Sequence, residues 1–207
     1  GITVQQDRPV TITAGDDWIP LKLELDIESG SALDFSPFGQ IDAPAGKHGW
    51  LQTTRRGEFV FAKDPEKKPR RFYGINLCFS AHYITHEQAE ILAERLLRLG
   101  YNTVRFHHHE GELVDRSKGT STTIKAGKLD QLDYLFAALK KRGLYVTTDL
   151  FVSRPVFQTE IWDDAPKGRN VSMNDFKMLI PVNEKAYANW QAFARNFLTH
   201  VNPYTKL

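Results

Sequence analysis

Three segments of the chain repeat one pattern of hydrophobic and polar positions. In each segment a short apolar run ends in polar residues, and hydrophobic residues spaced three and four apart follow it. The segments are Arg71 to Leu99, Tyr101 to Arg142 and Leu144 to Val201. An apolar run followed by an amphipathic helix is typical of a βα unit. The sequence therefore predicts an α/β fold with parallel strands centred near Ile75, Val104 and Val146.

The predicted helices have recognisable starts and stops. Thr85 and Gln88 have the spacing of a capping box, and Gly100 follows the last hydrophobic position of the first helix. The second helix carries its stripe between Leu129 and Leu139. A third helix is predicted from near Asn183 and ends before Asn202-Pro203. These stripes are predicted to face a sheet.

Residues 1–70 carry a different pattern, which favours strands and shows no helix. From Leu21 to Ile27, hydrophobic residues alternate with Lys22, Glu24 and Asp26, the period of a strand with one wet face. A second run, Glu58 to Phe61, could pair with it. We predict a β-rich lead-in module over 1–70, built on a small hairpin, and the βα units over 71–207.

Composition and charge limit the partners. The chain has 207 residues, of which 41% are hydrophobic, and its 27 basic and 25 acidic residues leave a formal charge of +2. Apart from the loop Lys67 to Arg71, the basic residues are scattered, so we expect no nucleic-acid partner. No apolar run approaches the ~18 residues of a membrane span, so we expect no membrane partner.

The cellular location stays open. A single cysteine, Cys78, excludes an internal disulfide without fixing the compartment. The chain opens with Gly1, so a secretory signal could have been removed. Secretion and export to a bacterial periplasm are therefore both compatible with the sequence.

Polar residues collect where the predicted strands end. They are Asn76, the run from Arg105 to Glu110, and Asp149. Parallel α/β folds place their chemistry at the carboxyl ends of the strands. Two long connections, Glu110 to Gly127 and Ser153 to Pro181, follow the second and third strands on that same side. Function is therefore expected at this end of the sheet.

Alternation along the second strand predicts which side chains face the site. If Val104 and Phe106 face the helices, Arg105 and His107 point to the other side. An arginine there needs an acceptor, and Asp149 at the end of the next strand is the expected partner. A structural ion pair and a functional one are equally compatible with this placement.

The run His107-His108-His109 suggests a metal, but neighbours on a strand point to opposite faces. At most His107 and His109 share a site, and no other ligand motif lies nearby. A hydrogen-bonding wall for a polar substrate fits better. We therefore expect no metal. We also expect no cofactor, since no glycine-rich phosphate loop follows a strand. Trp162 could stack on a sugar ring or anchor its loop.

Several motifs resemble one enzyme family. They are Phe72-Tyr73-Gly74-Ile75-Asn76-Leu77-Cys78, Gly100-Tyr101-Asn102-Thr103-Val104-Arg105-Phe106-His107-His108 and Asn202-Pro203-Tyr204-Thr205. Together they look like the opening strands of cellulase-like glycoside hydrolases, the family 5 type of clan A. The segments Gly30 to Ser36 and Ala43 to Gly49 are similar to the β lead-in of bacterial members.

The resemblance implies a (β/α)8 barrel that hydrolyses β-linked sugars with retention through two glutamates. One of them follows an asparagine at the end of the fourth strand. The only Asn-Glu here, Asn183-Glu184, opens the third helix and is at the wrong point of the fold. Arg105 matches the second-strand arginine that supports the nucleophile. We therefore interpret the chain as the front part of such an enzyme, inactive by itself.

This interpretation assigns roles to the strand-end residues. Arg105 and Asp149 are predicted to orient and support charge. Four residues are assigned to substrate binding: Asn76, His107, His108 and Trp162. The alternative is a non-catalytic carbohydrate-binding or assembly module. In both cases the third strand has an open edge, which predicts self-association or a covering part of the barrel.

Overall fold

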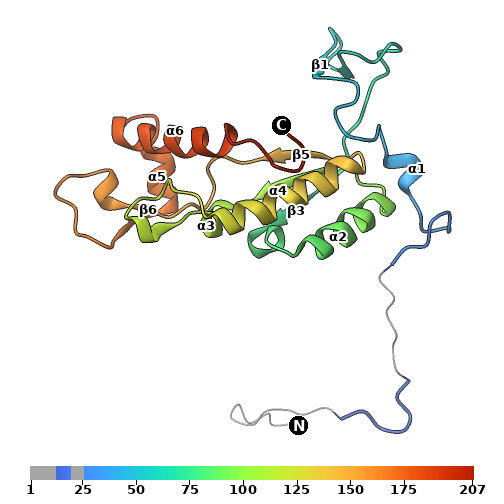
Figure 1. Ribbon diagram of the computed structural model, residues 1–207, viewed down its shortest axis with the longest axis horizontal. Helices are drawn as coiled ribbons and strands as arrows, with labels where there is room; N and C mark the ends of the chain where they lie inside the picture. Colours follow the sequence, from blue (N-terminus) through green and yellow to red (C-terminus); the bar gives the residue numbers. More distant parts are fainter. Residues whose placement is uncertain (1–12, 20–25) are drawn as a thin grey trace, which may run out of the picture.

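The computed structural model describes residues 13–19 and 26–207. It is a mixed α/β structure with one three-stranded parallel sheet and two short antiparallel pairs (Figure 1). Residues 21–25 of the first predicted strand lie outside the described residues, and Asp26 and Ile27 are not in a strand.

The parallel sheet confirms the three predicted strands. β3 (Gly74–Cys78), β4 (Thr103–His107) and β5 (Tyr145–Thr148) are hydrogen-bonded in that order. In register, Ile75 lies opposite Val104, which lies opposite Val146. All three carboxyl ends therefore meet at one edge of the sheet, as the argument from strand-end chemistry requires.

The three long helices are also confirmed. α2 (His86–Arg98) begins with the expected capping box, in which the Thr85 hydroxyl accepts from the Gln88 amide N–H and the Gln88 side chain accepts from the Thr85 N–H. α4 (Ala126–Lys141) follows β4, and α6 (Glu184–Leu198) is capped by Asn183. Gly100 has a φ of 80°, the left-handed conformation that ends helices.

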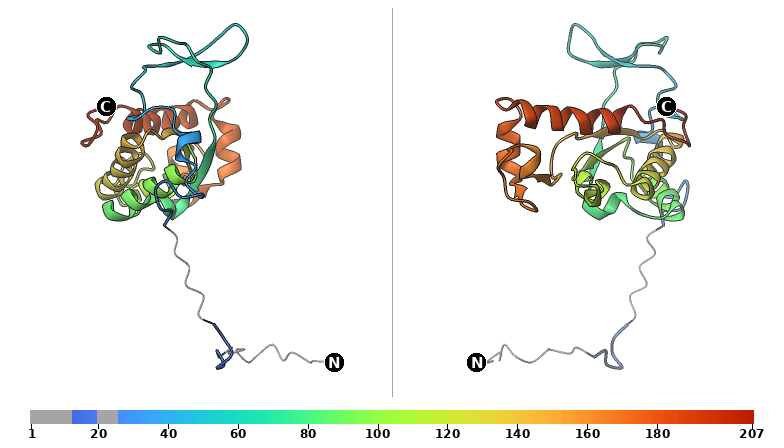
Figure 2. Two further views of the ribbon diagram at one scale, coloured as in Figure 1. Left: turned by 90° about the vertical axis from the view of Figure 1, so that its right-hand side faces the viewer. Right: turned by 60° about the vertical axis from the view of Figure 1, so that its left-hand side comes forward.

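The main core lies on one face of the sheet. Val104 and Phe106 of β4 are buried there, together with Leu96 of α2, Leu139 of α4 and Phe197 of α6. α2 and α4 run beside one another along the sheet, whereas α6 extends toward α5 (Figures 1 and 2). On the opposite face the alternate residues are exposed, and these are Asn76, Arg105 and Thr147. The predicted alternation on β4 is confirmed.

The two long connections contain more structure than expected. The first holds α3 (Glu110–Leu113) and the 3-10 turn η2 (Arg116–Lys118). The second holds the antiparallel pair β6 (Val156–Phe157) and β7 (Asn170–Val171), the turn η3 (Gln158–Glu160) and α5 (Met173–Leu179). A second apolar cluster that includes Phe176 lies among the elements of the second connection. Each of the elements in the two connections is too short for a hydrophobic periodicity to be recognised in the sequence.

The lead-in contains a hairpin and a short helix. Phe59–Phe61 is a strand, β2, and it pairs with β1 (Leu51–Thr53). Most of the run that was predicted as its partner, Leu21 to Ile27, lies outside the described residues. A short helix, α1 (Ser36–Gly39), was not expected. Its single turn has no room for a helical period, and Pro37 at its start favours the turn.

The lead-in packs tightly against the amino-terminal ends of the strands. The Asn102 side chain donates to the carbonyls of Gly39 at 2.9 Å and Arg71 at 3.0 Å, and accepts from the Tyr73 N–H. A Cβ on Gly39 would lie 2.0 Å from the Gly100 carbonyl oxygen. The hairpin β1–β2 stands at this end of the sheet, remote from the β6–β7 connection (Figures 1 and 2).

Candidate functional site

Arg105 and Asp149 form the centre of the candidate site. Arg105, on β4, donates from Nη2 to Asp149 Oδ1 at 2.8 Å and from Nε to the same oxygen at 3.3 Å. The Arg105 side chain is 44% exposed and that of Asp149 is 19% exposed. The predicted partnership is therefore present, and the arginine lies on the open face of the sheet with donors still accessible to a ligand.

The second oxygen of Asp149 is hydrogen-bonded to Nδ1 of His107. Partial burial works to raise the pKa of Asp149, but the hydrogen bonds and positive charge of Arg105 and His107 outweigh it and hold the pKa below its usual range. Asp149 is consequently a carboxylate near neutral pH. It can orient a ligand, Arg105 or His107, and it has no proton to give as an acid.

Asn76 lies on the same face, directly opposite Arg105 in the register of β3 and β4. Its side chain is exposed. Asn76, Arg105 and Thr147 line a cavity of about 490 Å³ whose other wall includes Leu51 and Phe59 of the β1–β2 hairpin. Four predicted site residues, Asn76, Arg105, His107 and Asp149, are thus brought to one surface.

His108 leaves the strand in a left-handed conformation, with a φ of 56°. Its ring stacks on Phe79, with ring centroids 4.6 Å apart and an interplanar angle of 21°. Desolvation, and then the neighbouring His107, lower the pKa of His108. The imidazole is therefore neutral at neutral pH and sits at the edge of the site.

His109 and Glu110 turn into the protein, away from the site. Both side chains are fully buried. Burial lowers the pKa of His109 to about 4. The Glu110 carboxylate accepts from the backbone N–H groups of Val152 at 2.7 Å and Ser153 at 3.2 Å. His109 therefore shares no surface with His107. Among the described residues no group of three His, Cys, Asp or Glu side chains could hold a metal ion.

Trp162 lies apart from the Arg105–Asp149 pair. It follows η3 in the long connection after β5 and is 41% exposed. It lines a surface hollow of about 790 Å³ together with Asp163, Val182 and Lys185, none of which borders the strand-end residues. The connection extends beyond the carboxyl ends of the strands (Figure 1), so Trp162 is on the expected side of the fold.

Sequence reasoning missed a buried polar network beneath this connection. Arg154 is 3% exposed and donates from Nη1 to the carbonyl and hydroxyl oxygens of Ser121 at 2.8 Å. Burial lowers its pKa to about 10. Asn189 of α6 donates to the same hydroxyl and to Glu160. No sequence signal links these residues, because they come from three separate segments.

The asparagine of the Asn202-Pro203-Tyr204-Thr205 motif is structural. Its buried side chain donates to the Asp133 carbonyl at 3.0 Å and accepts from the N–H groups of Tyr204 and Thr205. His200 donates or accepts a further bond with Asp133 at 2.8 Å. These bonds fasten the segment after α6 to α4. The motif therefore supports the fold and carries no chemistry in this structure.

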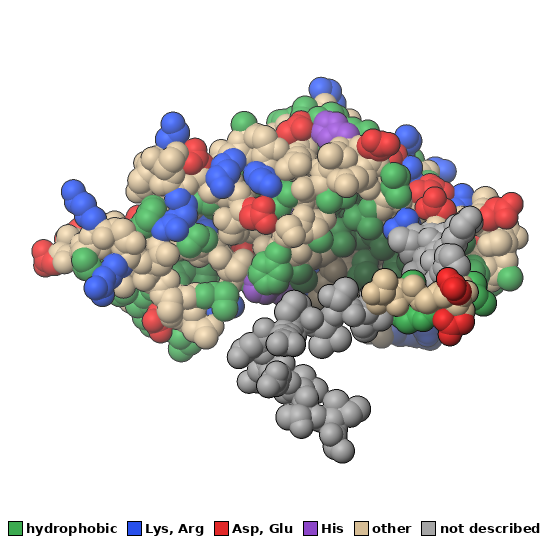
Figure 3. Space-filling model, turned by 90° about the horizontal axis from the view of Figure 1, so that it is seen from below, with side chains coloured by type: hydrophobic (Ala, Val, Ile, Leu, Met, Phe, Trp, Pro, Cys, Tyr) green, Lys and Arg blue, Asp and Glu red, His purple; other side chains and the backbone are tan. Residues whose placement is uncertain are grey.

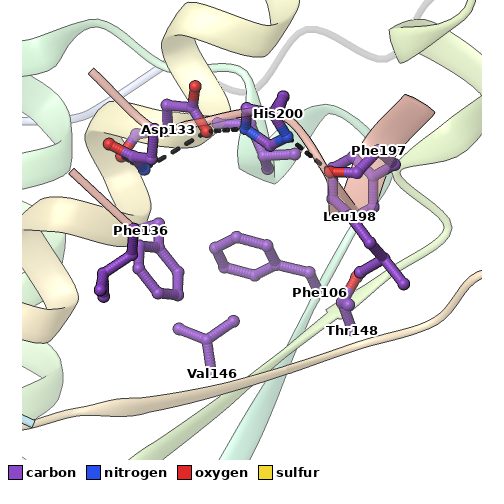
Figure 4. A pocket seen from close by; sticks show the side chains of 11 residues that line it. Phe106, Asp133, Phe136, Val146, Thr148, Phe197, Leu198 and His200 are labelled. Atoms are coloured by element: carbon purple, nitrogen blue, oxygen red, sulfur yellow. Dashed lines mark hydrogen bonds and ion pairs between the residues drawn. The ribbon is translucent and has the colours of Figure 1, made fainter. Parts of the chain in front are cut away.

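An apolar cavity of about 220 Å³ adjoins the edge strand β5. Phe106 and Val146 enter it from the sheet, Phe136 from α4 and Phe197 from α6, while the His200–Asp133 bond closes one side (Figure 4). Among the described residues no further strand pairs with β5. This is the open edge that the sequence predicts.

No protein-family model, curated protein or solved structure matches this chain. The relation to cellulase-like glycoside hydrolases therefore stays a prediction from the motifs.

Two further properties concern the helices and the charge on the molecular surface. Every helix of the described residues is too short or too polar to cross a bilayer. On the face shown in Figure 3, acidic and basic side chains are intermixed and form no single-sign stripe.

Proposed function

We propose that the chain forms the first three βα units of a cellulase-like (β/α)8 barrel and contributes the supporting part of a site that hydrolyses β-linked glycosides. The lead-in over 1–70 and the units over 71–207 are proposed as its two parts. The observation that carries the proposal is the Arg105–Asp149–His107 cluster. It lies at the carboxyl ends of adjacent parallel strands and on the face opposite the helices.

In this proposal Arg105 and Asp149 position other groups and support charge. An exposed arginine, held by one carboxylate on one side, keeps donors that can bind and orient a second carboxylate or a sugar hydroxyl. Asn76, His107 and His108 border the same surface and supply further polar contacts. Trp162 supplies an aromatic face farther out on the same side of the fold.

In this proposal the ends of β3, β4 and β5 do not supply the pair of carboxyl groups that retaining hydrolysis requires. Such a pair stands ~5 to 5.5 Å apart, with one group held protonated. Asp149 is ionised, and the nearest carboxylate in sequence to β4, Glu110, is buried against backbone N–H groups. We therefore propose that the two catalytic glutamates belong to strands outside these residues.

The test compares the 207-residue chain with the product of any reading frame that continues beyond Leu207, using aryl β-glycosides, β-glucan and β-mannan. The longer product is expected to hydrolyse at least one of them, and the present chain none. Turnover by the present chain that disappears in Glu110→Gln or Asp149→Asn would place the catalytic pair within it. A longer product that hydrolyses nothing contradicts the proposal.

A second candidate is a non-catalytic carbohydrate-binding or assembly module. The observation that favours it is Trp162, which is partly exposed and lines a large hollow to which none of the cluster residues contributes. Binding of glucan or mannan by the longer product without hydrolysis, lost in Trp162→Ala, would select this candidate.

The open edge of β5 is proposed to be covered in the working protein by a further strand or by another copy. Unpaired backbone groups and the apolar cavity beside Val146 favour such a partner. Light scattering on the chain is expected to show self-association. A well-behaved monomer contradicts this expectation.

A further inference from the structure

Two neighbouring strands end in the same unusual way. Cys78 is paired with His107, so Phe79 and His108 occupy equivalent positions one residue beyond β3 and β4. Both are non-glycine residues in the left-handed region, with φ values of 53° and 56°. That region is unfavourable for bulky side chains, and it persists where the surrounding structure enforces it, often at functional sites.

The left-handed turn changes where these side chains lie. Continued alternation would place Phe79 on the face of Leu77, which is buried beneath the helices. Instead the Phe79 side chain is 58% exposed. The turn η1 (Phe79–His82) holds this arrangement, since Nδ1 of His82 bonds to the Phe79 carbonyl at 2.8 Å. A large hydrophobic ring is thus kept in solvent at the mouth of the site.

One face of the Phe79 ring is occupied and the other is available. His108 stacks on the occupied face, and the His108 ring in turn contacts His107 edge-on at 4.2 Å between centroids. Through His107, Phe79 is connected to Asp149 and Arg105. The ring therefore stands beside a group of hydrogen-bond donors and acceptors, an arrangement that suits a ligand with one apolar face and polar edges.

We propose that Phe79, backed by His108, is a stacking platform for a pyranose ring of a β-linked sugar chain, whose hydroxyls then contact the Arg105–Asp149–His107 cluster. This inference rests on the proposed function and names a binding residue for the same site. A pyranose carries axial C–H bonds on its faces and hydroxyls around its rim, which matches an exposed aromatic face flanked by charged groups. His108 supports the Phe79 ring from its other face, in addition to the polar contact proposed for it above.

The platform is tested on the 207-residue chain by NMR titration with cellohexaose and mannohexaose, with α-linked maltohexaose as the ligand control. We expect a β-linked hexaose to bind the unmodified chain. Phe79→Ala should weaken that binding about tenfold, the size expected for loss of one aromatic contact. Phe79→Tyr keeps the ring and should retain affinity.

Two further variants separate binding from folding. Phe38→Ala removes an aromatic side chain that is 86% exposed on α1, at the other end of the strands, and should leave affinity unchanged. Phe79→Gly relieves the left-handed strain, so its melting temperature should not fall although sugar binding is lost. A purely structural Phe79 would instead lower the melting temperature in Phe79→Ala and in Phe79→Gly.

The outcomes distinguish this inference from the proposed function. Equal affinity of Phe79→Ala and the unmodified chain, or no binding of either β-linked hexaose by the unmodified chain, overturns the platform. Hydrolysis by the longer product that is insensitive to Phe79→Ala overturns the platform and leaves the glycosidase intact. Binding that depends on Phe79 in a longer product without hydrolysis supports the platform and overturns the glycosidase.

Discussion

The two faces of the β3–β4–β5 sheet are built from alternate residues of the same strands, yet they differ in burial and in charge. Val104 and Phe106 are buried under helices, whereas Arg105 between them is exposed and paired with Asp149. One face lowers the free energy of folding through apolar burial. The other contributes little to stability and gathers polar groups. We therefore expect that removing a side chain from the helix-covered face mainly lowers stability, and that removing one from the polar face changes stability little.

The largest expected effect is on the helix-covered face. Phe106→Ala removes a ring that is 2% exposed and enlarges the cavity beside Val146, so it should lower the free energy of unfolding by about 3 to 5 kcal/mol. Urea denaturation measures this. Arg105→Ala on the same strand is the matched control and should cost about 1 kcal/mol or less. Equal losses would break the distinction between the faces.

The next effect concerns His109, which turns from the strand end into the core. Its pKa falls from 6.5 to about 4 because burial disfavours the charged form. As the pH falls through 6.5, His109 becomes protonated in the unfolded chain but stays neutral in the folded chain. The free energy of unfolding should therefore decrease as the pH falls from 6.5 to about 4, by about 3 kcal/mol in total.

His109→Leu is the matching variant for that pH dependence. It should flatten the dependence, leaving the parts due to His82 and His108, whose pKa values burial also lowers. Urea denaturation at several pH values checks this. An unchanged slope in His109→Leu would show that another group is responsible.

Glu110 should show an intermediate effect. Its carboxylate is fully buried and holds the N–H groups of Val152 and Ser153, so Glu110→Gln exchanges charge-assisted bonds for weaker ones. We expect a loss of about 2 kcal/mol. Amide hydrogen exchange at Val152 and Ser153 should accelerate more than at Val104. Full stability together with lost sugar binding would place Glu110 in the site after all.

The smallest effect is expected at Asp149. Arg105 and His107 depress its pKa against the opposing influence of burial, so its contribution is present above the usual value of 3.8 and is lost as the pH falls through the lower folded-state value. Because the pair is partly exposed, Asp149→Asn should cost about 1 kcal/mol or less at neutral pH. The difference between variant and unmodified chain should vanish in acid, and a constant difference would contradict this account.

The strands and long helices were predictable because each has enough residues for a period to show. Thr85, Gln88 and Gly100 carry local chemistry that marks a helix end without help from the rest of the fold. The pairing of Arg105 with Asp149 followed from alternation and from the need of a guanidinium for an acceptor. The parallel pairing of β4 with β5 then places the ends of these two strands side by side.

Elsewhere local rules failed for identifiable reasons. Alternation stops at Phe79 after β3 and at His108 after β4, and so it could not show that Phe79 is exposed or that His109 is buried. The strand β1 has only three residues, and its partner β2 lies across a turn, so a more regular run competed for the assignment. Arg154, Ser121 and Asn189 meet only through tertiary packing. Such contacts between distant segments leave no trace in spacing or composition.

The glycines where the lead-in meets the sheet allow the backbones of the two parts to come into direct contact. A Cβ on Gly143 would lie 1.9 Å from the Asp42 carbonyl oxygen, and Tyr145 at the start of β5 donates from its hydroxyl to the Asp42 carboxylate at 2.8 Å. A protein trimmed at Arg71 would lose these contacts at the start of its strands. Gly100 and Gly143 also have φ values of 80° and 85°, which favour glycine at the ends of α2 and α4, so we expect both glycines to be retained beside a different lead-in.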